Sequence, residues 1–196
     1  MNIDQCIMKK TKLYLLGLVL IAASCGKDAN NPIDALTTVE VETEKKETAE
    51  IPTLPTSLPI PAGGIEISLP AYRSATESKK FFEDNHTNPN LVNTVKAKKI
   101  YLKMVAPDTG NFNCMDRVKV YISANGYDEI LVAQKDNIPK GLKTIETDPV
   151  DVELKNYFVQ DSVFFRVVPH IVDYPPANGL LEMGSTFKVS ITASKY

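Results

Sequence analysis

The sequence predicts an all-β fold, in which short antiparallel strands enclose a single core. Several segments alternate apolar and polar residues with a period of two, the pattern of strands with one face packed and one face in water. Glycine, proline and asparagine form turn signals between these segments. Removing an N-terminal segment of about 24 residues would leave roughly 170, which is enough for one domain and a tail.

Residues 99–105 alternate most clearly, with Ile100 and Leu102 on the apolar face. The same pattern predicts strands at 117–123 and at 187–193. Four further strands are expected at 65–69, 130–134, 143–147 and 162–172. Two short helical pieces are expected at 74–85, with Ser78 or Thr76 as the cap, and at 152–159.

About seven short strands separated by turns resemble the immunoglobulin-like β-sandwich. The resemblance is to the architecture and not to the antibody family, because the chain has no Trp and the domain lacks the usual Cys–Trp–Cys signature. Residues 64–196, which form the predicted domain, also resemble domains of uncharacterised lipoproteins of Gram-negative bacteria. The predicted fold is therefore an antiparallel, immunoglobulin-like β-sandwich that follows a disordered N-terminal stalk.

The N-terminus is typical of a secretory signal peptide, predicted to cover residues 1–24. A basic cluster, Lys9, Lys10 and Lys12, precedes the uncharged apolar run 13–23. The run is too short for a membrane-spanning helix, which needs about 20 residues. Translation starting at Met8 instead of Met1 would give a cleaner signal, because Asp4 is unusual in such a basic region.

The tract Ile21-Ala22-Ala23-Ser24-Cys25 resembles the lipobox of bacterial lipoproteins, although Ala22 stands where leucine is usual. The resemblance implies that Cys25 receives a lipid and becomes the mature N-terminus. Two or three acyl chains would then anchor the protein stably in a membrane. Gly26 in place of aspartate implies the outer membrane of the cell envelope, with the periplasmic or surface side left open. The alternative is an ordinary signal peptide that carries a cysteine by chance.

Residues 25–63 are predicted to be a flexible linker. They contain several prolines and the run 40–47, which is rich in glutamate and threonine and offers little apolar surface to bury. A spacer is one interpretation, and a ligand for a proline-reading partner is the other. The linker carries 3 Lys against 7 acidic residues, whereas 64–196 carries 16 basic and 16 acidic residues. A neutral domain argues against nucleic acid as a partner.

Residues suited to catalysis or metal binding are sparse. Cys114 could be a reactive thiol, but a lone cysteine among apolar residues is more often core filler. His86 and His170 have no ligand-like neighbours, so neither a metal nor a cofactor is predicted. Asp151 and Glu153, on one face of an expected strand, are either half of a calcium site or a solvated face.

Two hypotheses of function remain, and a purely structural spacer is a third. The first is a non-enzymatic binding module that contacts an envelope protein or a glycan. Its candidate surface is Tyr101 and Tyr121, predicted on the outward faces of neighbouring strands, since aromatic rings stack on sugars and anchor proteins. The second is an envelope hydrolase or metal-dependent enzyme that uses Asp151, Glu153 or His170. The oligomeric state is left open.

Overall fold

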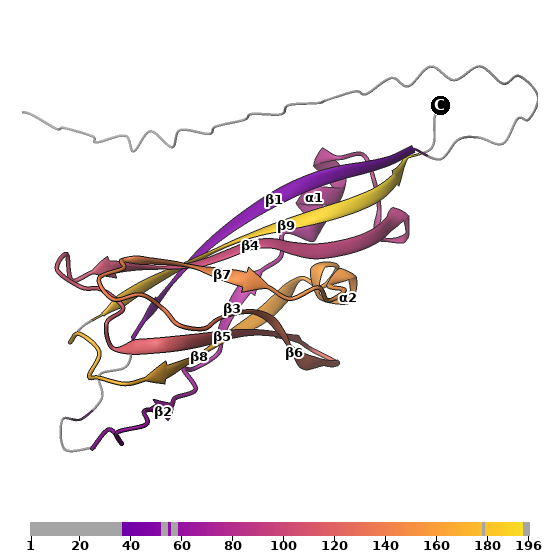
Figure 1. Ribbon diagram of the computed structural model, residues 1–196. Helices are drawn as coiled ribbons and strands as arrows, with labels where there is room; N and C mark the ends of the chain where they lie inside the picture. Colours follow the sequence, from indigo (N-terminus) through magenta and orange to yellow (C-terminus); the bar gives the residue numbers. More distant parts are fainter. Residues whose placement is uncertain (1–36, 52–54, 56–58, 178, 194–196) are drawn as a thin grey trace, which may run out of the picture. The chain divides into compact units, whose positions relative to one another are not determined.

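A computed structural model describes residues 37–51, 55, 59–177 and 179–193 of the chain (Figure 1). All of these residues belong to one compact unit, Asp34–Tyr196. The predicted signal peptide and Cys25 lie outside the described residues. No helix within the described ranges is long and apolar enough to cross a membrane.

The described residues form nine strands and three short helices. The strands are β1 (Thr37–Glu50), β2 (Ile65–Glu66), β3 (Tyr72–Ala75), β4 (Val92–Ala106), β5 (Met115–Ala124), β6 (Tyr127–Lys135), β7 (Thr144–Pro149), β8 (Ser162–Ile171) and β9 (Leu180–Ala193). The helices are α1 (Ser78–Asp84), the 3-10 helix η1 (Pro89–Leu91) and α2 (Lys155–Phe158). The all-β prediction is confirmed, and each of the seven predicted strands overlaps a strand of the structure.

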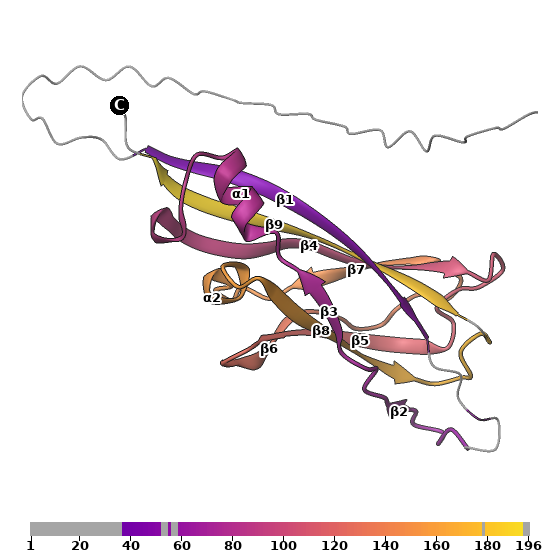
Figure 2. The same cartoon turned by 180° about the vertical axis from the view of Figure 1, so that it is seen from behind.

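The strands form one curled antiparallel sheet in the order β1-β9-β4-β7-β6-β5-β8-β2, with β3 also paired to β8. The sheet turns at β7, because its first residues pair with β4 and its last residues pair with β6. In Figures 1 and 2, β1, β9 and β4 run side by side, and β3, β8 and β5 form a second group. The two groups face each other across the core.

The core is built by the alternating faces that the sequence predicts. Ile100 and Leu102 of β4 are completely buried, and so is Val120 of β5. Val118 and Ile122 lie on the same face of β5 and are also buried. The hairpin between β5 and β6 turns at Gly126, whose φ of 80° suits glycine. Alternation therefore correctly identifies the packed face of the central strands.

The prediction of a flexible linker over 25–63 is wrong for Thr37–Glu50, which form β1. This strand pairs with β9 along its whole length, from Thr37 opposite Ala193 to Glu50 opposite Leu180. Its exposed and half-buried residues alternate along the strand. The sequence does carry a period-two signal there, but the glutamates and threonines that fill it are also typical of disordered segments.

The acidic residues of β1 lie beside lysines of the neighbouring strands. Glu40 forms an ion pair with Lys188 of β9 at 2.6 Å. Glu42 forms an ion pair with Lys98 of β4. The excess of acid that the sequence shows before residue 64 is thus partly balanced by lysines of the domain, because β1 belongs to the same sheet.

Both predicted helical pieces are present, although they are shorter than expected. The N-cap residue of α1 is Glu77, with a left-handed φ of 52° and no capping side chain. The prediction that Ser78 or Thr76 would occupy the cap is therefore wrong, although Thr76 Oγ1 does accept a hydrogen bond from the Ser78 backbone N–H at 3.3 Å. Phe158 of α2 packs edge-on against Phe81 of α1, which joins the two helices at one end of the core.

Candidate functional site

The two predicted binding residues, Tyr101 and Tyr121, do not share a surface. Tyr101 lies on β4 and Tyr121 lies on β5, and β7 and β6 separate these strands in the sheet. The prediction that they lie on neighbouring strands is wrong. Strands that follow each other in sequence are often neighbours in a sheet, but here β4 pairs with β9 and β7.

Tyr101 covers a glycine of the adjacent strand. It lies opposite Gly184 of β9, and a Cβ atom at that position would collide with its ring. The Tyr101 hydroxyl lies 3.4 Å from Glu182 Oε1. Burial raises the pKa of the Tyr101 hydroxyl. The ring therefore supplies packing that Gly184 lacks, which is a structural role.

Tyr121 is held by a charged side chain of β8. The guanidinium carbon of Arg166 lies 4.6 Å from the centre of the Tyr121 ring, a cation–π geometry. Arg166 also forms a two-pronged ion pair with Glu129 and donates to Ser68 Oγ at 2.9 Å. The Arg166 hydrogen bond lowers the pKa of the Glu129 carboxyl. This arrangement anchors Tyr121 within the sheet surface.

The structure does not bring the candidate catalytic residues together. Asp151 is exposed and forms an ion pair with Lys96 at 2.9 Å. Glu153 lies in a loop and not on a strand, and its Oε1 accepts hydrogen bonds from the backbone N–H groups of Val95 at 2.8 Å and Lys155 at 2.9 Å. Glu153 thus holds the start of α2 against β4. Across the described ranges, no three His, Cys, Asp or Glu side chains converge as metal ligands would.

His170 forms a separate pair with a carboxylate of β5. Its Nδ1 lies 2.6 Å from Asp116 Oδ1, and its ring is buried. Gly64 packs so closely on the ring that a Cβ atom there would lie 2.8 Å from Nε2. Desolvation by itself would raise the pKa of Asp116, but the His170 hydrogen bond and the charges of His170 and Arg117 outweigh it, so this pKa is lowered.

The remaining candidates lie apart from one another. Cys114 is buried in the core, and its burial raises the pKa of the thiol, which disfavours the reactive thiolate. The core-filler interpretation of this residue thus has structural support. His86 is exposed in the loop after α1, with a left-handed φ of 47°.

A feature that sequence reasoning missed is the place where the two ends of the curled sheet meet. We call it the β1–β3 seam, formed by residues 43–51 on one side and 67–77 on the other. Side chains bridge it: Ser74 donates to Glu47 at 2.7 Å, and Lys45 pairs with Glu77 at 2.7 Å. These contacts show that β1 and β3 run in opposite directions. Among the described pairings β1 bonds to β9 and β3 bonds to β8, so no backbone ladder joins the two strands.

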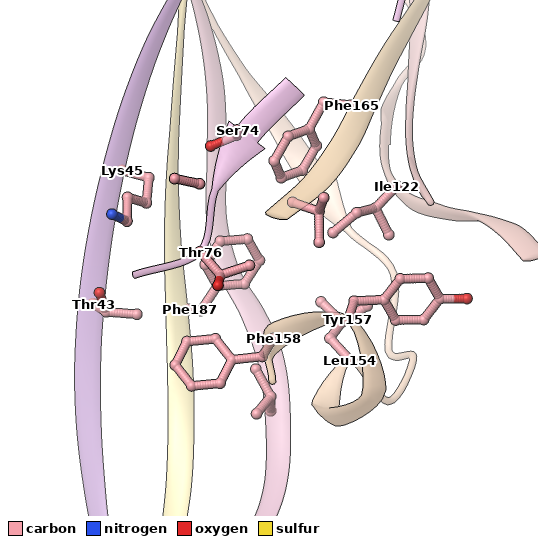
Figure 3. Close-up of a pocket in the computed structure, with 13 residues that line it drawn as sticks. Thr43, Lys45, Ser74, Thr76, Ile122, Leu154, Tyr157, Phe158, Phe165 and Phe187 are labelled. Carbon is pink, nitrogen blue, oxygen red and sulfur yellow. The ribbon is translucent and has the colours of Figure 1, made fainter. Parts of the chain in front are cut away.

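A first cavity lies under the seam, between β1, β3 and α2 (Figure 3). Thr43 and Lys45 reach it from β1, and Ser74 and Thr76 reach it from the opposite side. Its floor is apolar and consists of Val95, Ile122, Leu154, Tyr157, Phe158, Val163, Phe165 and Phe187. The volume is about 30 Å³, room for about two waters.

A second cavity lies under the other end of the same seam. Ile51, which follows β1, faces Ile67 and Leu69 across it. Its remaining lining is also apolar: Leu102, Phe112, Cys114, Met115, Val167, Pro169, Ile171, Pro175 and Leu181. The volume is again about 30 Å³.

Tyr72 of β3 is half-buried in the seam. Its hydroxyl donates to the Met183 sulfur at 2.8 Å, and its ring stacks on Phe165. Burial, with the nearby charge of Glu47, raises the pKa of Tyr72. The seam therefore brings two strand edges together over two cavities that are lined mainly by apolar side chains.

Comparison with known proteins adds no family. No family model matches the chain, and no curated protein matches it either. Among solved structures, a chain of Desmodium yellow mottle tymovirus is 8% identical, with 89% of this chain and 97% of that chain covered and a TM-score of 0.23. A chain of the semi-empty virus-like particle of Macrobrachium rosenbergii nodavirus is 11% identical, with 97% and 100% covered and a TM-score of 0.26. Turnip yellow mosaic virus gives 8% identity, 92% coverage of both chains and a TM-score of 0.22. Similarities this low support no inference about function.

Proposed function

We propose that this protein is a lipid-anchored lipoprotein of the cell envelope whose all-β domain is a non-enzymatic binding module for another envelope protein. The β1–β3 seam is the observation that carries the proposal. Two strand edges face each other there over apolar openings, and edges of this kind recognise extended polypeptide.

The anchor is proposed at Cys25, on the outer membrane. The supporting evidence is the order of the N-terminal segments: a basic cluster, an 11-residue apolar run and a lipobox-like tract. Lipidation would hold the domain at the membrane surface, where its partners would be other proteins of the envelope.

The finer fold class that we propose is the immunoglobulin-like β-sandwich. The supporting observation is that side chains of β9 and β4 line the first cavity together with side chains of β5 and β8. Antiparallel strands that pack face to face in this way are typical of sandwiches. The turn of the sheet at β7 would then be the point where a strand passes from one layer to the other.

The proposal is tested by chemical crosslinking of the full chain in its native membrane, followed by identification of the captured proteins. We expect the wild-type protein in the membrane fraction, crosslinked to a small set of envelope proteins. Cys25→Ser should leave the membrane fraction and lose these crosslinks. Retention of this variant in the membrane would contradict the anchor, and a wild-type protein without any crosslinked partner would contradict the binding function.

A further inference from the structure

We propose that β1 is an exchangeable strand, which leaves its own domain and pairs with β9 of a second copy of this chain. In return, β1 of the second copy pairs with β9 of the first, which gives a closed dimer. Each copy then completes the sheet of the other. This inference goes beyond the proposed binding function, because it concerns contacts between copies of one chain and needs no envelope partner.

β1 buries less than the core strands do, so it can leave its place while the rest of the sheet persists. Residues 39–50 are all exposed or half-buried. β1 pairs with β9 along one edge, and its other edge has no backbone ladder among the described pairings. Two side-chain contacts bridge the seam, Ser74–Glu47 and Lys45–Glu77, and contacts of these kinds contribute about 1 kcal/mol each. Detachment of β1 therefore breaks one ladder and a few side-chain contacts, while β9 stays paired with β4.

The edge of β9 that β1 covers is specific for the charges of β1. Glu40 forms an ion pair with Lys188 of β9 at 2.6 Å, and Glu42 pairs with Lys98 of β4. Removal of β1 leaves both lysines without these carboxylates and exposes unpaired N–H and C=O groups, which are a template for another strand. β1 of a second copy restores the same ladder and the same two ion pairs in the same register. Charge and register therefore identify the strand that fits this edge as a second β1.

Exchange keeps the contacts of the sheet and changes only which copies share them. The 14 residues of β1 form the same ladder within one copy or between two. The remaining cost is the loss of freedom on association, so the dimer gains population as the protein concentration rises. Residues 51–64 connect β1 to β2 and contain four prolines. Proline-rich segments favour an extended backbone, which suits a connection that reaches from one copy to another.

The experiment forms disulfides across the β1–β9 ladder of the full chain. Glu44 lies opposite Thr186, and residues directly opposite each other in an antiparallel pair are about 4.5–5.5 Å apart, within disulfide range. Glu44→Cys and Thr186→Cys are placed in two differently tagged copies, which are co-expressed, purified in detergent and oxidised. Lys103→Cys and Thr144→Cys are the matched pair, because these residues also lie opposite each other, on β4 and β7, which do not exchange. The native cysteines are the same in both pairs.

We expect a covalent dimer that carries both tags, at least about tenfold more abundant for Glu44→Cys with Thr186→Cys than for the matched pair. Non-reducing gels measure the amount of this dimer. A chain that carries both Glu44→Cys and Thr186→Cys confirms that the disulfide closes across the ladder. Equal amounts of dimer in the two pairs, while this double variant closes its disulfide, would overturn the inference.

A synthetic peptide of residues 37–50 tests the specificity of the β9 edge. Added in excess before oxidation, it should lower the amount of covalent dimer at least about threefold, because it occupies β9. A scrambled peptide of the same composition should leave the dimer unchanged, and equal effects of the two peptides would overturn the assignment of this edge to β1. A chain that forms no dimer here but is crosslinked to an envelope protein in its membrane would overturn exchange and leave the binding function standing.

Discussion

Strand β9 has two neighbours, β1 and β4, that pair with it over similar lengths but differ in what they bury. β4 places Val95, Ile100 and Leu102 in the core without exposure to solvent. The inward residues of β1 include Thr43, Lys45 and Glu47, all of them half-buried. β1 is thus attached mainly by its backbone ladder and ion pairs, whereas β4 is attached by its ladder and by the core.

The number of backbone pairs in a ladder therefore does not measure how stably a strand is attached to the domain. Backbone bonds exchange for bonds to water on opening, so each contributes only about 0.5–1.5 kcal/mol net. Burial of a large aliphatic side chain adds about 1.5–3 kcal/mol. We therefore expect β1 to open locally while β4 opens only with the whole domain.

The largest difference between β4 and β1 is expected when an inward-facing side chain of each strand is truncated. Leu102→Ala should lower the free energy of unfolding by about 2–5 kcal/mol, because it creates a cavity in the core. Val41→Ala in β1 should lower it by about 1 kcal/mol or less, since Val41 is half-buried. Urea titration of both variants measures the difference. Equal losses of unfolding free energy in the two variants would show that β1 is a core strand like β4, and would contradict the difference proposed between the two strands.

The next largest effect on stability is expected at Gly184 of β9, which lies opposite Tyr101 of β4. Gly184→Ala should destabilise the domain by about 1–3 kcal/mol, because the added Cβ collides with the Tyr101 ring. In the double variant with Tyr101→Ala the added methyl group should cost much less, since the collision is gone. Additive losses in a double-mutant cycle would contradict the contact between the two residues.

Amide hydrogen exchange compares the two neighbours of β9 directly. Bonded amides of β1 should exchange at least about tenfold faster than those of β4, which corresponds to about 1.4 kcal/mol of opening free energy. Mass spectrometry of peptic fragments measures both strands in one sample. Matching rates would mean that β1 and β4 open together as one cooperative unit.

The dependence of stability on pH tests the contribution of the central strand β5, where Asp116 pairs with His170. The folded-state pKa of Asp116 lies below its value of about 3.9 in an unfolded chain. Its carboxylate therefore stabilises the fold above that pH, and the contribution is lost as the pH falls through the folded-state pKa. Asp116→Asn has no carboxyl group to titrate at this position, so it should lose this part of the decline in stability. When the pH is lowered from 5 into the acid range, the thermal midpoint of the variant should fall by a few degrees less than that of the wild-type protein. Parallel curves for the two proteins would show that the pair is not coupled to folding.

Salt should produce the smallest effect, and only in β1. The Glu40–Lys188 and Glu42–Lys98 pairs are about half exposed, so each contributes less than about 1 kcal/mol and is screened in 1 M salt. Exchange at β1 amides should accelerate severalfold between low and high salt, with β4 unchanged. An equal response of both strands would point to a general effect of salt on the domain.

Much of the sheet could be predicted from the sequence because alternation is a local signal. The strand at 99–105 was identified by Ile100 and Leu102, and both residues are fully buried. β1 was missed because its alternating residues are mostly Thr, Glu and Lys, which have no strong preference for a core. What makes this segment a strand is its backbone ladder with β9, in which Glu42 lies opposite Lys188 of a segment far along the chain.

The candidate site was predictable only in part. Tyr101 and Tyr121 were correctly placed on strands, yet their separation depends on β6 and β7 lying between those strands. No local pattern in the sequence predicts the seam, since Glu47 and Ser74 come into contact only when the two ends of the curled sheet meet.

The amino-acid sequence alone predicts which residues of the central strands face the core and where the chain turns. These properties follow from the two-residue period of a strand and from the conformations that glycine and proline favour. By contrast, three features are seen only in the folded domain: the acidic segment is a strand, β1 and β3 meet, and two cavities lie beneath them. Each of these features depends on pairing between residues far apart in the chain, and alternation carries no information about partners.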